Sequence, residues 1–222
     1  EELDLASVEK FLAENVEGLR GPIVIEQFPS GYSNLTYLLR MSDRELVLRR
    51  PPFGRKARTA HDMGREYRIM KALEATFPFS PRPLAYTEDE SVIGSPFYVM
   101  ERIRGIILRR DPPKGFNLSR ERMKALCENL LDVHHQLHSV DYSSIGLESL
   151  GKPDGYVRRQ VEGWSERYRA ARTPDAPLFE SVMSWLAQSM PEDSQKPALI
   201  HNDYKFDNVV LDPSNDLRII GV

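Results

Sequence analysis

Residues 201–208 read HNDYKFDN and carry the side chains with the clearest chemistry in this sequence. Asp203 has a carboxylate that could orient a hydroxyl group and accept its proton. Asn208 offers an uncharged amide oxygen, which suits the hard cation Mg²⁺. Lys205 could neutralise a phosphate group during its transfer. The octapeptide therefore predicts a site where a phosphoryl group moves to a hydroxyl.

The spacing of this octapeptide, H-x-D-x-x-x-x-N, is the one used in the catalytic loop of protein kinases. Two apolar runs follow it, residues 209–211 and 217–222, and they read as strands joined by a turn. A polar turn ahead of an ordinary hairpin is the competing interpretation. We favour a catalytic loop because the motif comes late in the chain, directly before apolar strands. We expect a structural role for His201 and leave Asp207 open between metal, substrate and structural roles.

A kinase also needs groups that approach the nucleotide phosphates, and residues 30–36, SGYSNLT, are one candidate. They lie between two predicted strands, and small or hydroxyl residues let backbone N–H groups come close to phosphate oxygens. The predicted cofactor-binding residues of this loop are Ser30, Gly31, Ser33 and Asn34. A plain hairpin turn is the alternative interpretation.

The pair Arg49 and Glu66 is a second candidate for holding phosphates. Residues 46–49, LVLR, stand where a kinase has V-A-I-K on its third strand, and the cation there holds the α- and β-phosphates. Glu66, in the following predicted helix, is the carboxylate expected to hold that cation. Strand alternation places Arg50 on the face opposite Arg49, so we favour Arg49. Taken alone, Arg49 could also be a surface residue at a strand end, and Glu66 an ordinary exposed glutamate.

Residues 97–105, FYVMERIRG, read as a strand that leaves the first lobe. An adenine ring needs an apolar slot and two backbone hydrogen bonds, which an extended linker can provide. The backbones of Glu101 and Ile103 are the predicted source of these bonds. A buried strand with a polar end is the alternative.

Hydrophobic periodicity predicts an α+β chain with three parts. These are an N-terminal helix (1–20), a β-rich lobe with one helix (21–103) and a mainly helical lobe that holds the octapeptide (104–222). The predicted helices cover 4–17, 60–75, 119–139, 154–171 and 176–189, and the predicted strands cover 23–28, 35–40, 45–49, 92–93, 97–100, 209–211 and 217–222.

The composition is that of an ordinary globular protein, with 41% hydrophobic and 28% charged residues and a net charge of −3. No long run of one sign recommends nucleic acid or an anionic membrane as a partner. The single cysteine, Cys127, excludes an intrachain disulfide and a cysteine-based zinc site. No run approaches the ~18 apolar residues of a membrane span. We expect a cytoplasmic protein.

Taken in order, the segments SGYSNLTY, VLRRPP, REY, FYVME and HNDYKFDN resemble the aminoglycoside phosphotransferase / choline kinase family. Residues 155–164, GYVRRQVEGW, resemble the branch that includes the kinase-like domains attached to some acyl-CoA dehydrogenases. The resemblance implies a protein-kinase-like fold with a β-rich N-lobe, a helical C-lobe and MgATP in the cleft. It implies Asp203 as catalytic base, Asn208 as metal ligand, and Arg49 with Glu66 as the phosphate-positioning pair.

Two features depart from the family pattern. The usual Lys is replaced by Arg49, and the metal-binding Asp that normally follows the strand after the catalytic loop does not occur within residues 1–222. We therefore expect the C-lobe to be truncated in this sequence. The predicted function is transfer of the γ-phosphoryl group of ATP, with Mg²⁺, to a small-molecule hydroxyl acceptor. A nucleotide-binding pseudokinase is the alternative, and the sequence does not identify the acceptor.

Overall fold

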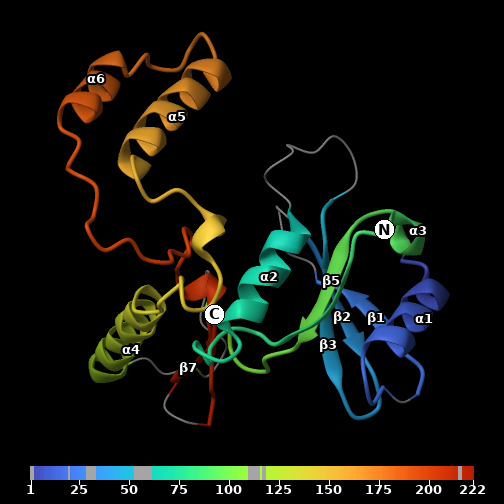
Figure 1. Ribbon diagram of the computed structural model, residues 1–222. Helices are drawn as coiled ribbons and strands as arrows, with labels where there is room; N and C mark the ends of the chain where they lie inside the picture. The colour runs from blue at the N-terminus through green and yellow to red at the C-terminus, as the bar shows by residue number, and fades with distance from the viewer. Residues whose placement is uncertain are drawn as a thin grey trace. The chain divides into compact units, whose positions relative to one another are not determined.

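The computed structural model describes residues 3–19, 21–28, 34–52, 62–109, 116, 119–214 and 217–222. The chain divides into two compact units, one formed by residues 1–140 with 200–222 and the other by residues 141–199 (Figure 1). The elements of the first unit are α1 (Leu5–Asn15), β1 (Val24–Gln27), β2 (Leu35–Arg40), β3 (Glu45–Arg50), α2 (Met63–Leu73), β4 (Pro83–Thr87), α3 (Glu90–Ile93), β5 (Phe97–Glu101), α4 (Arg120–His138), the 3-10 helix η2 (Phe206–Asn208), β6 (Val210–Leu211) and β7 (Ile219–Gly221). The second unit contains the 3-10 helix η1 (Glu148–Leu150), α5 (Tyr156–Ala171) and α6 (Glu180–Gln188).

Five strands of the first unit form one antiparallel sheet in the order β1-β2-β3-β5-β4. The central strand β3 pairs with β2 on one side and with β5 on the other, so Arg49 lies opposite Thr36 in β2 and opposite Tyr98 in β5. This register places residues from distant parts of the sequence beside Arg49.

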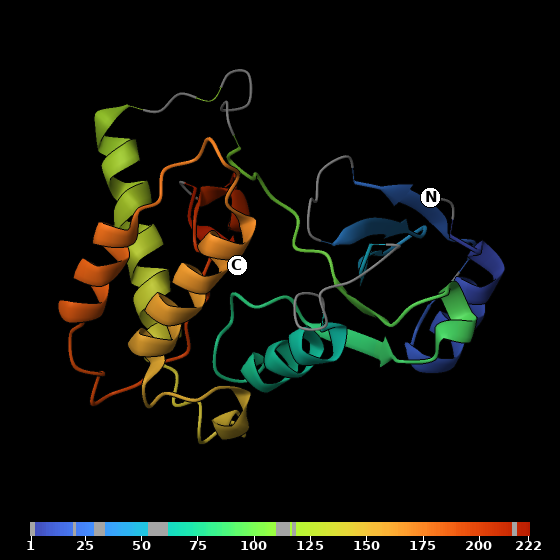
Figure 2. The same cartoon turned by 90° about the horizontal axis from the view of Figure 1, so that it is seen from above.

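The main core of the first unit covers one face of this sheet. Leu46 and Leu48 project from β3 to this face and pack with Val8 and Leu12 of α1 and with Phe97 of β5. Complete burial of such a side chain contributes about 1.5–3 kcal/mol. Figures 1 and 2 show α1 beside the short helix α3 at this side of the sheet.

Helix α2 belongs to the other face of the sheet, beside β4 and β5. Gly64 permits a close approach, because a Cβ atom at this position would lie 2.6 Å from the Tyr86 hydroxyl oxygen. The Asp62 side chain caps the helix by accepting a hydrogen bond from the Arg65 backbone N–H at 2.8 Å. The cap and the glycine together fix the start of the helix that carries Glu66.

The segment that leaves β5 is joined to the hairpin of β6 and β7. Ile106 and Leu211 exchange two backbone hydrogen bonds, each 2.8 Å long. A Cβ atom at Gly105 would lie 2.3 Å from the Leu211 carbonyl oxygen, so only glycine fits there without a shift. The linker therefore lies next to the strand that follows the octapeptide, and the lobe boundary at residue 103 stays a prediction.

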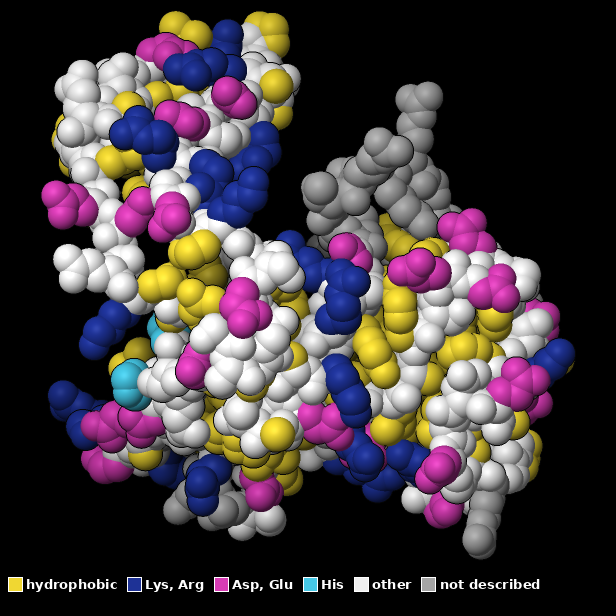
Figure 3. Space-filling view, viewed as in Figure 1, with side chains coloured by type: hydrophobic (Ala, Val, Ile, Leu, Met, Phe, Trp, Pro, Cys, Tyr) yellow, Lys and Arg dark blue, Asp and Glu magenta, His cyan; other side chains and the backbone are white. Residues whose placement is uncertain are grey.

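The second unit is built on the helix pair α5 and α6. Two hydrogen bonds, of 2.9 and 2.7 Å, join the Arg169 guanidinium to the Glu180 carboxylate, and the Tyr168 hydroxyl donates to the Pro177 carbonyl. On the face drawn in Figure 3, acidic and basic side chains are interspersed. Among the described helices of both units, none combines the length and the apolar character needed to cross a membrane.

Most predicted elements occur with shifted ends, but one prediction was wrong and one strand was missed. Residues 92–93, predicted as a strand, belong to helix α3. Asp89 caps this helix at Ser91, and Gly94, with φ 76°, ends it in the left-handed conformation. The missed strand is β4, whose sequence begins with a proline, a residue that disfavours a strand assignment.

Candidate active site

Asp203 lies at the centre of a hydrogen-bonded loop. The Asn208 side-chain nitrogen donates to the Asp203 backbone oxygen and to its Oδ2, both at 2.8 Å. Lys205 Nζ lies 3.0 Å from Asp203 Oδ1, and 62% of the Asp203 side chain is exposed. Lys205 first, and then Asn208, hold the pKa of Asp203 below its ordinary value. The loop therefore presents an oriented, ionised carboxylate to solvent.

The turn before Asp203 depends on an unusual backbone conformation. Asn202 has φ 65°, in the left-handed region that asparagine tolerates better than most residues. The Asp203 backbone N–H donates to His201 Nδ1 at 3.3 Å. Burial lowers the pKa of His201, although Asp203 opposes this effect, so the ring is neutral at pH 7 and Nδ1 can accept. This contact agrees with the structural role predicted for His201.

Helix α4 supports the loop and the hairpin that follows it. The Tyr204 hydroxyl donates to the Leu130 carbonyl at 2.8 Å, and the Tyr204 ring stacks on His134 with centroids 4.3 Å apart. Asn129 Oδ1 accepts a hydrogen bond from the Ile219 backbone N–H at 2.7 Å. These contacts attach both the octapeptide and β7 to α4.

Arg49 and Glu66, predicted as a pair, are in contact. Arg49 Nη1 lies 3.3 Å from Glu66 Oε2, and about a third of each side chain is exposed, 32% in both cases. Burial alone would lower the pKa of Arg49, but Tyr98 and Glu66 outweigh it and raise the pKa. Arg49 Nε is buried and has no hydrogen-bond partner among the described residues. The guanidinium is thus charged, held at one end, and has an unused donor.

Two further side chains bind the same carboxylate. The Tyr98 hydroxyl donates to Glu66 Oε2 at 2.8 Å, and Asn34 Nδ2 donates to Glu66 Oε1 at 3.2 Å. Tyr98 is 1% exposed and Asn34 is 5% exposed. Asn34 was predicted to bind the cofactor as part of its loop. Its side chain is instead engaged with Glu66, and a contact from its backbone to phosphate stays a prediction.

Sequence reasoning missed Tyr98, which stands in the apolar run FYVM. Nothing in that run shows that its hydroxyl meets a carboxylate from α2. Strand alternation alone separates Tyr98 from its neighbours Phe97 and Val99, which pack in the core on the other face. The pairing of Arg49 with Tyr98 requires β3 to lie beside β5, which local patterns do not specify.

The predicted adenine-binding segment has one clearly available backbone. Within the part of the chain that the structure describes, the N–H and C=O groups of Ile103 have no hydrogen-bond partner. The Glu101 N–H is already used, because it donates to the Arg82 carbonyl at 2.9 Å. Glu101 would therefore have to contribute through its carbonyl. Ile103 packs on Gly221 of β7, where a Cβ atom would lie 2.6 Å from Ile103 Cδ1.

Three of the predicted cofactor-binding residues, Ser30, Gly31 and Ser33, lie outside the described residues. The structure therefore gives no account of the loop between β1 and β2 beyond Asn34. The predicted contact of these residues with phosphate stays a prediction.

The predicted metal ligand Asn208 directs its nitrogen to Asp203, so its Oδ1 is left for another partner. The described residues contain no group of three His, Cys, Asp or Glu side chains placed to hold a metal ion. Mg²⁺ commonly keeps several waters and binds one or two protein ligands together with substrate phosphates. Asn208 Oδ1, the charged Arg49 guanidinium and the open backbone of Ile103 thus fit the needs of a magnesium–nucleotide complex.

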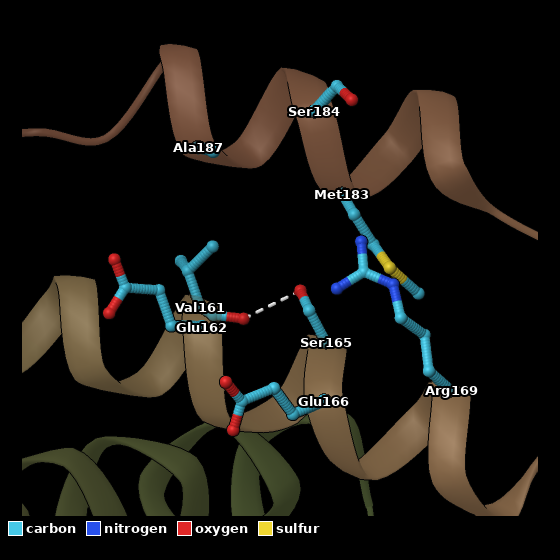
Figure 4. Close-up of a pocket in the computed structure, with 8 residues that line it drawn as sticks. All are labelled: Val161, Glu162, Ser165, Glu166, Arg169, Met183, Ser184 and Ala187. Carbon is cyan, nitrogen blue, oxygen red and sulfur yellow. Dashed lines mark hydrogen bonds between the residues drawn. The ribbon is translucent and has the colours of Figure 1, made fainter.

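A shallow pocket occurs within the second unit, between α5 and α6 (Figure 4). Its Ser165 hydroxyl donates to the Val161 carbonyl of the same helix at 2.7 Å, and its Arg169 is paired with Glu180. None of the predicted site residues lines it. The lining residues are Val161, Glu162, Ser165, Glu166, Arg169, Met183, Ser184 and Ala187.

A five-stranded antiparallel sheet, a helix carboxylate bonded to the β3 cation and an H-x-D-x-x-x-x-N loop define a protein-kinase-like fold. The model of the phosphotransferase enzyme family, APH, matches residues 24–222. The chain belongs to this phosphotransferase family.

Curated relatives are much longer than this chain. Acyl-CoA dehydrogenase family member 11 of Gallus gallus is 38% identical over 225 residues, which cover 99% of this chain and 28% of that protein. Acyl-CoA dehydrogenase family member 10 of Mus musculus is 40% identical over 193 residues, which cover 87% of this chain and 18% of that protein. The chain thus spans less than a third of either relative.

Solved structures give the same fold. A candidate aminoglycoside phosphotransferase from Ralstonia eutropha JMP134 superposes with a TM-score of 0.84 at 34% identity, covering 100% of this chain and 64% of that one. A streptomycin–ATP–APH(2″)-IIa ternary complex superposes with a TM-score of 0.62 at 19% identity, covering 100% of this chain and 70% of that one. The second likeness shows the fold alone.

Proposed function

We propose that this protein transfers the γ-phosphoryl group of ATP to a hydroxyl group of a small molecule, with Asp203 as the base. The observation that carries the proposal is the oriented, ionised and solvent-accessible carboxylate of Asp203 in the octapeptide. The acceptor oxygen forms a bond to the γ-phosphorus while the bond from that phosphorus to the β,γ-bridging oxygen breaks. The acceptor proton passes to Asp203, and ADP is the leaving group.

The other residues of the site would position the nucleotide. Arg49, one-third exposed and held by Glu66, would bind the α- and β-phosphates with its charged guanidinium. The Ile103 backbone would bind the adenine edge, and Asn208 Oδ1 would be a ligand of Mg²⁺, which neutralises phosphate charge when bound. Lys205 would exchange its contact with Asp203 for a γ-phosphate oxygen. Positioning and charge stabilisation would supply most of the rate enhancement.

The names of the curated relatives suggest which acceptor to test first. The curated relatives are named as acyl-CoA dehydrogenase family members, and residues of this chain match less than a third of their length. In such a relative, a kinase segment in the same chain as an acyl-CoA dehydrogenase would be expected to act on a metabolite chemically related to the acyl-CoA substrate. We therefore place hydroxyacyl thioesters first in an acceptor panel, ahead of sugars, aminoglycosides and choline-like amines.

The test compares the unchanged full-length protein with Asp203→Asn. Each is incubated with MgATP and the acceptor panel, and phosphorylated product is measured by mass spectrometry. We expect product formation to fall by about 100-fold or more in the variant, because a positioned general base contributes about 10²–10⁴-fold. Binding of MgATP should persist in the variant. Thermal shift can detect it, because a ligand at 100 times its Kd stabilises the folded protein by about 2.7 kcal/mol.

Asp141→Asn is the matched control, because Asp141 accepts hydrogen bonds from Ser143 in a turn outside the site. It should turn over like the unchanged protein. Full product formation by Asp203→Asn would remove Asp203 from the role of base. MgATP binding without product from any acceptor would instead favour a nucleotide-binding module.

A further inference from the structure

The Arg49–Glu66 ion pair is a single contact between two long side chains. The Arg49 Nη1–Glu66 Oε2 distance is 3.3 Å, and about a third of each side chain is exposed, 32% in both. One such contact leaves both side chains several rotatable bonds, so further contacts are needed to fix their orientation. A group that fixes Glu66 would also help to orient Arg49 through this contact.

Tyr98 supplies such a group. Its ring is buried in β5 with 1% exposure, and β5 places it directly opposite Arg49 in β3. Its hydroxyl donates to Glu66 Oε2 at 2.8 Å, on the same oxygen that contacts Arg49. Tyr98 also raises the pKa of Arg49, as an oxygen close to the guanidinium does. A rigid, buried phenol thus bridges the two charged partners.

The protonation state of the Tyr98 hydroxyl allows it to bridge Arg49 and Glu66. Burial is the main reason that the pKa of Tyr98 rises above its usual value, and Glu66 adds to the rise while Arg49 opposes it. The hydroxyl is therefore protonated and can donate to the carboxylate at any physiological pH. Asn34 Nδ2 fixes the other oxygen of Glu66 at 3.2 Å, so both oxygens are bound.

We propose that Tyr98 is a positioning residue, which orients Arg49 through Glu66 so that the guanidinium can grip the nucleotide phosphates. This inference rests on the proposed function, because it concerns the same nucleotide site. It predicts that the Tyr98 hydroxyl matters for binding of phosphates and not for binding of the adenosine part. Tyr98 itself touches neither ATP nor the acceptor in this account.

The test uses Tyr98→Phe, which removes the hydroxyl and keeps the buried ring. The dissociation constants of MgATP and of adenosine are measured by calorimetry for the full-length protein. We expect MgATP binding to weaken about tenfold, the scale of a lost hydrogen bond to a charged group, and adenosine binding to be unchanged. Where turnover is detected, kcat should fall while the KM for the acceptor stays the same.

Tyr86→Phe is the matched control. Tyr86 lies opposite Tyr98 in the neighbouring strand β4, and its hydroxyl donates to Glu88 at 2.6 Å rather than to Glu66. Removal of this hydroxyl should leave both dissociation constants unchanged. A similar loss of MgATP affinity in Tyr86→Phe would indicate a general effect on the sheet and overturn the inference.

A double-mutant cycle separates positioning from packing. If Tyr98 acts through Glu66, Tyr98→Phe should cause no further loss of MgATP affinity in a Glu66→Gln background. Losses that multiply would overturn the inference. If the unchanged protein binds no MgATP, the proposed function is wrong and the inference falls with it. If it binds MgATP and Tyr98→Phe binds equally well, only the inference is wrong.

Discussion

Arg49 and Arg50 are consecutive residues of β3 whose side chains serve opposite faces of the same sheet. Arg49 contacts Glu66 of α2 on the face that carries the candidate site. Arg50 is 1% exposed, and its Nη1 donates to the Ile93 carbonyl of α3 at 2.9 Å on the other face. The strand geometry thus gives one arginine a candidate ligand-binding role and the other a structural role.

The positions of Arg49 and Arg50 predict that the same substitution, Arg→Met, lowers stability at one position and MgATP affinity at the other. Arg50→Met leaves the Ile93 carbonyl without its charged donor, so we expect the free energy of unfolding to fall by about 1–3 kcal/mol. Arg49→Met should change the unfolding free energy by about 1 kcal/mol at most, because its ion pair is one-third exposed, yet weaken MgATP binding about tenfold or more. Urea unfolding and calorimetric titration measure the two quantities. Equal effects of both variants on MgATP binding would contradict the division of roles.

Asn208 should set the magnesium requirement of the proposed reaction. Asn208→Ala removes the amide oxygen, and we expect the Mg²⁺ concentration for half-maximal product formation to rise about tenfold, the smaller end of the range for altered metal-site residues. The measurement is a magnesium titration of product formation at fixed ATP.

Asn129→Ala is a suitable comparison, because Asn129 holds the Ile219 backbone and lies outside the octapeptide. It should lower thermal stability while the half-maximal Mg²⁺ concentration stays the same. A shift of that concentration in both variants would show that the effect comes from the hairpin rather than from a metal ligand.

Gly105 should be intolerant of even the smallest side chain. The Cβ atom of Gly105→Ala would meet the Leu211 backbone oxygen at 2.3 Å, and backbone atoms cannot move aside as a flexible side chain can. We expect a loss of about 1–3 kcal/mol of unfolding free energy from this overpacking. Gly151→Ala is the control, since a Cβ there meets no atom within 4 Å and its φ is −150°. Thermal unfolding of the two variants should differ clearly, and equal stability would contradict the close approach.

Acidification should destabilise the first unit before its carboxylates titrate. Burial lowers the pKa of His201 and of His138 below the usual value of about 6.5. Between the folded-state and the unfolded-state pKa of these histidines, the unfolded chain binds more protons than the folded chain. Their contribution to the free energy of unfolding is therefore complete above about pH 6.5 and is lost as the pH falls through the folded-state pKa. Thermal unfolding between about pH 7.5 and 5.5 measures this slope.

His138→Gln should reduce the pH dependence, because Gln does not titrate. His135→Gln, on the exposed side of α4, serves as the matched change on the same helix. A Tm that rises as the pH is lowered through this window would show that the sign of the linkage is wrong. A slope that is identical in the unchanged protein and in His138→Gln would assign the effect to other groups.

Local sequence patterns predicted many of the helices and strands, because these elements depend largely on interactions between residues close together in the chain. Strand β2 has the predicted bounds, and β3 differs from its prediction by one residue. Helix α3 shows the limit of such patterns. Val92 and Ile93 are β-branched and favour a strand, but the Asp89 cap and the left-handed Gly94 stabilise a single helical turn instead.

The sequence by itself determined the octapeptide, its spacing from Asp203 to Asn208, and the opposite directions of Arg49 and Arg50, since each depends on neighbours along the chain. The tertiary structure decided what lies beside them. Tyr98 reaches Glu66 only because β3 pairs with β5 and α2 lies along the same face, and Ile103 is next to Gly221 only because the linker bonds to β6. These contacts join residues 32 or more positions apart, where packing and backbone pairing determine position and local propensity carries no information.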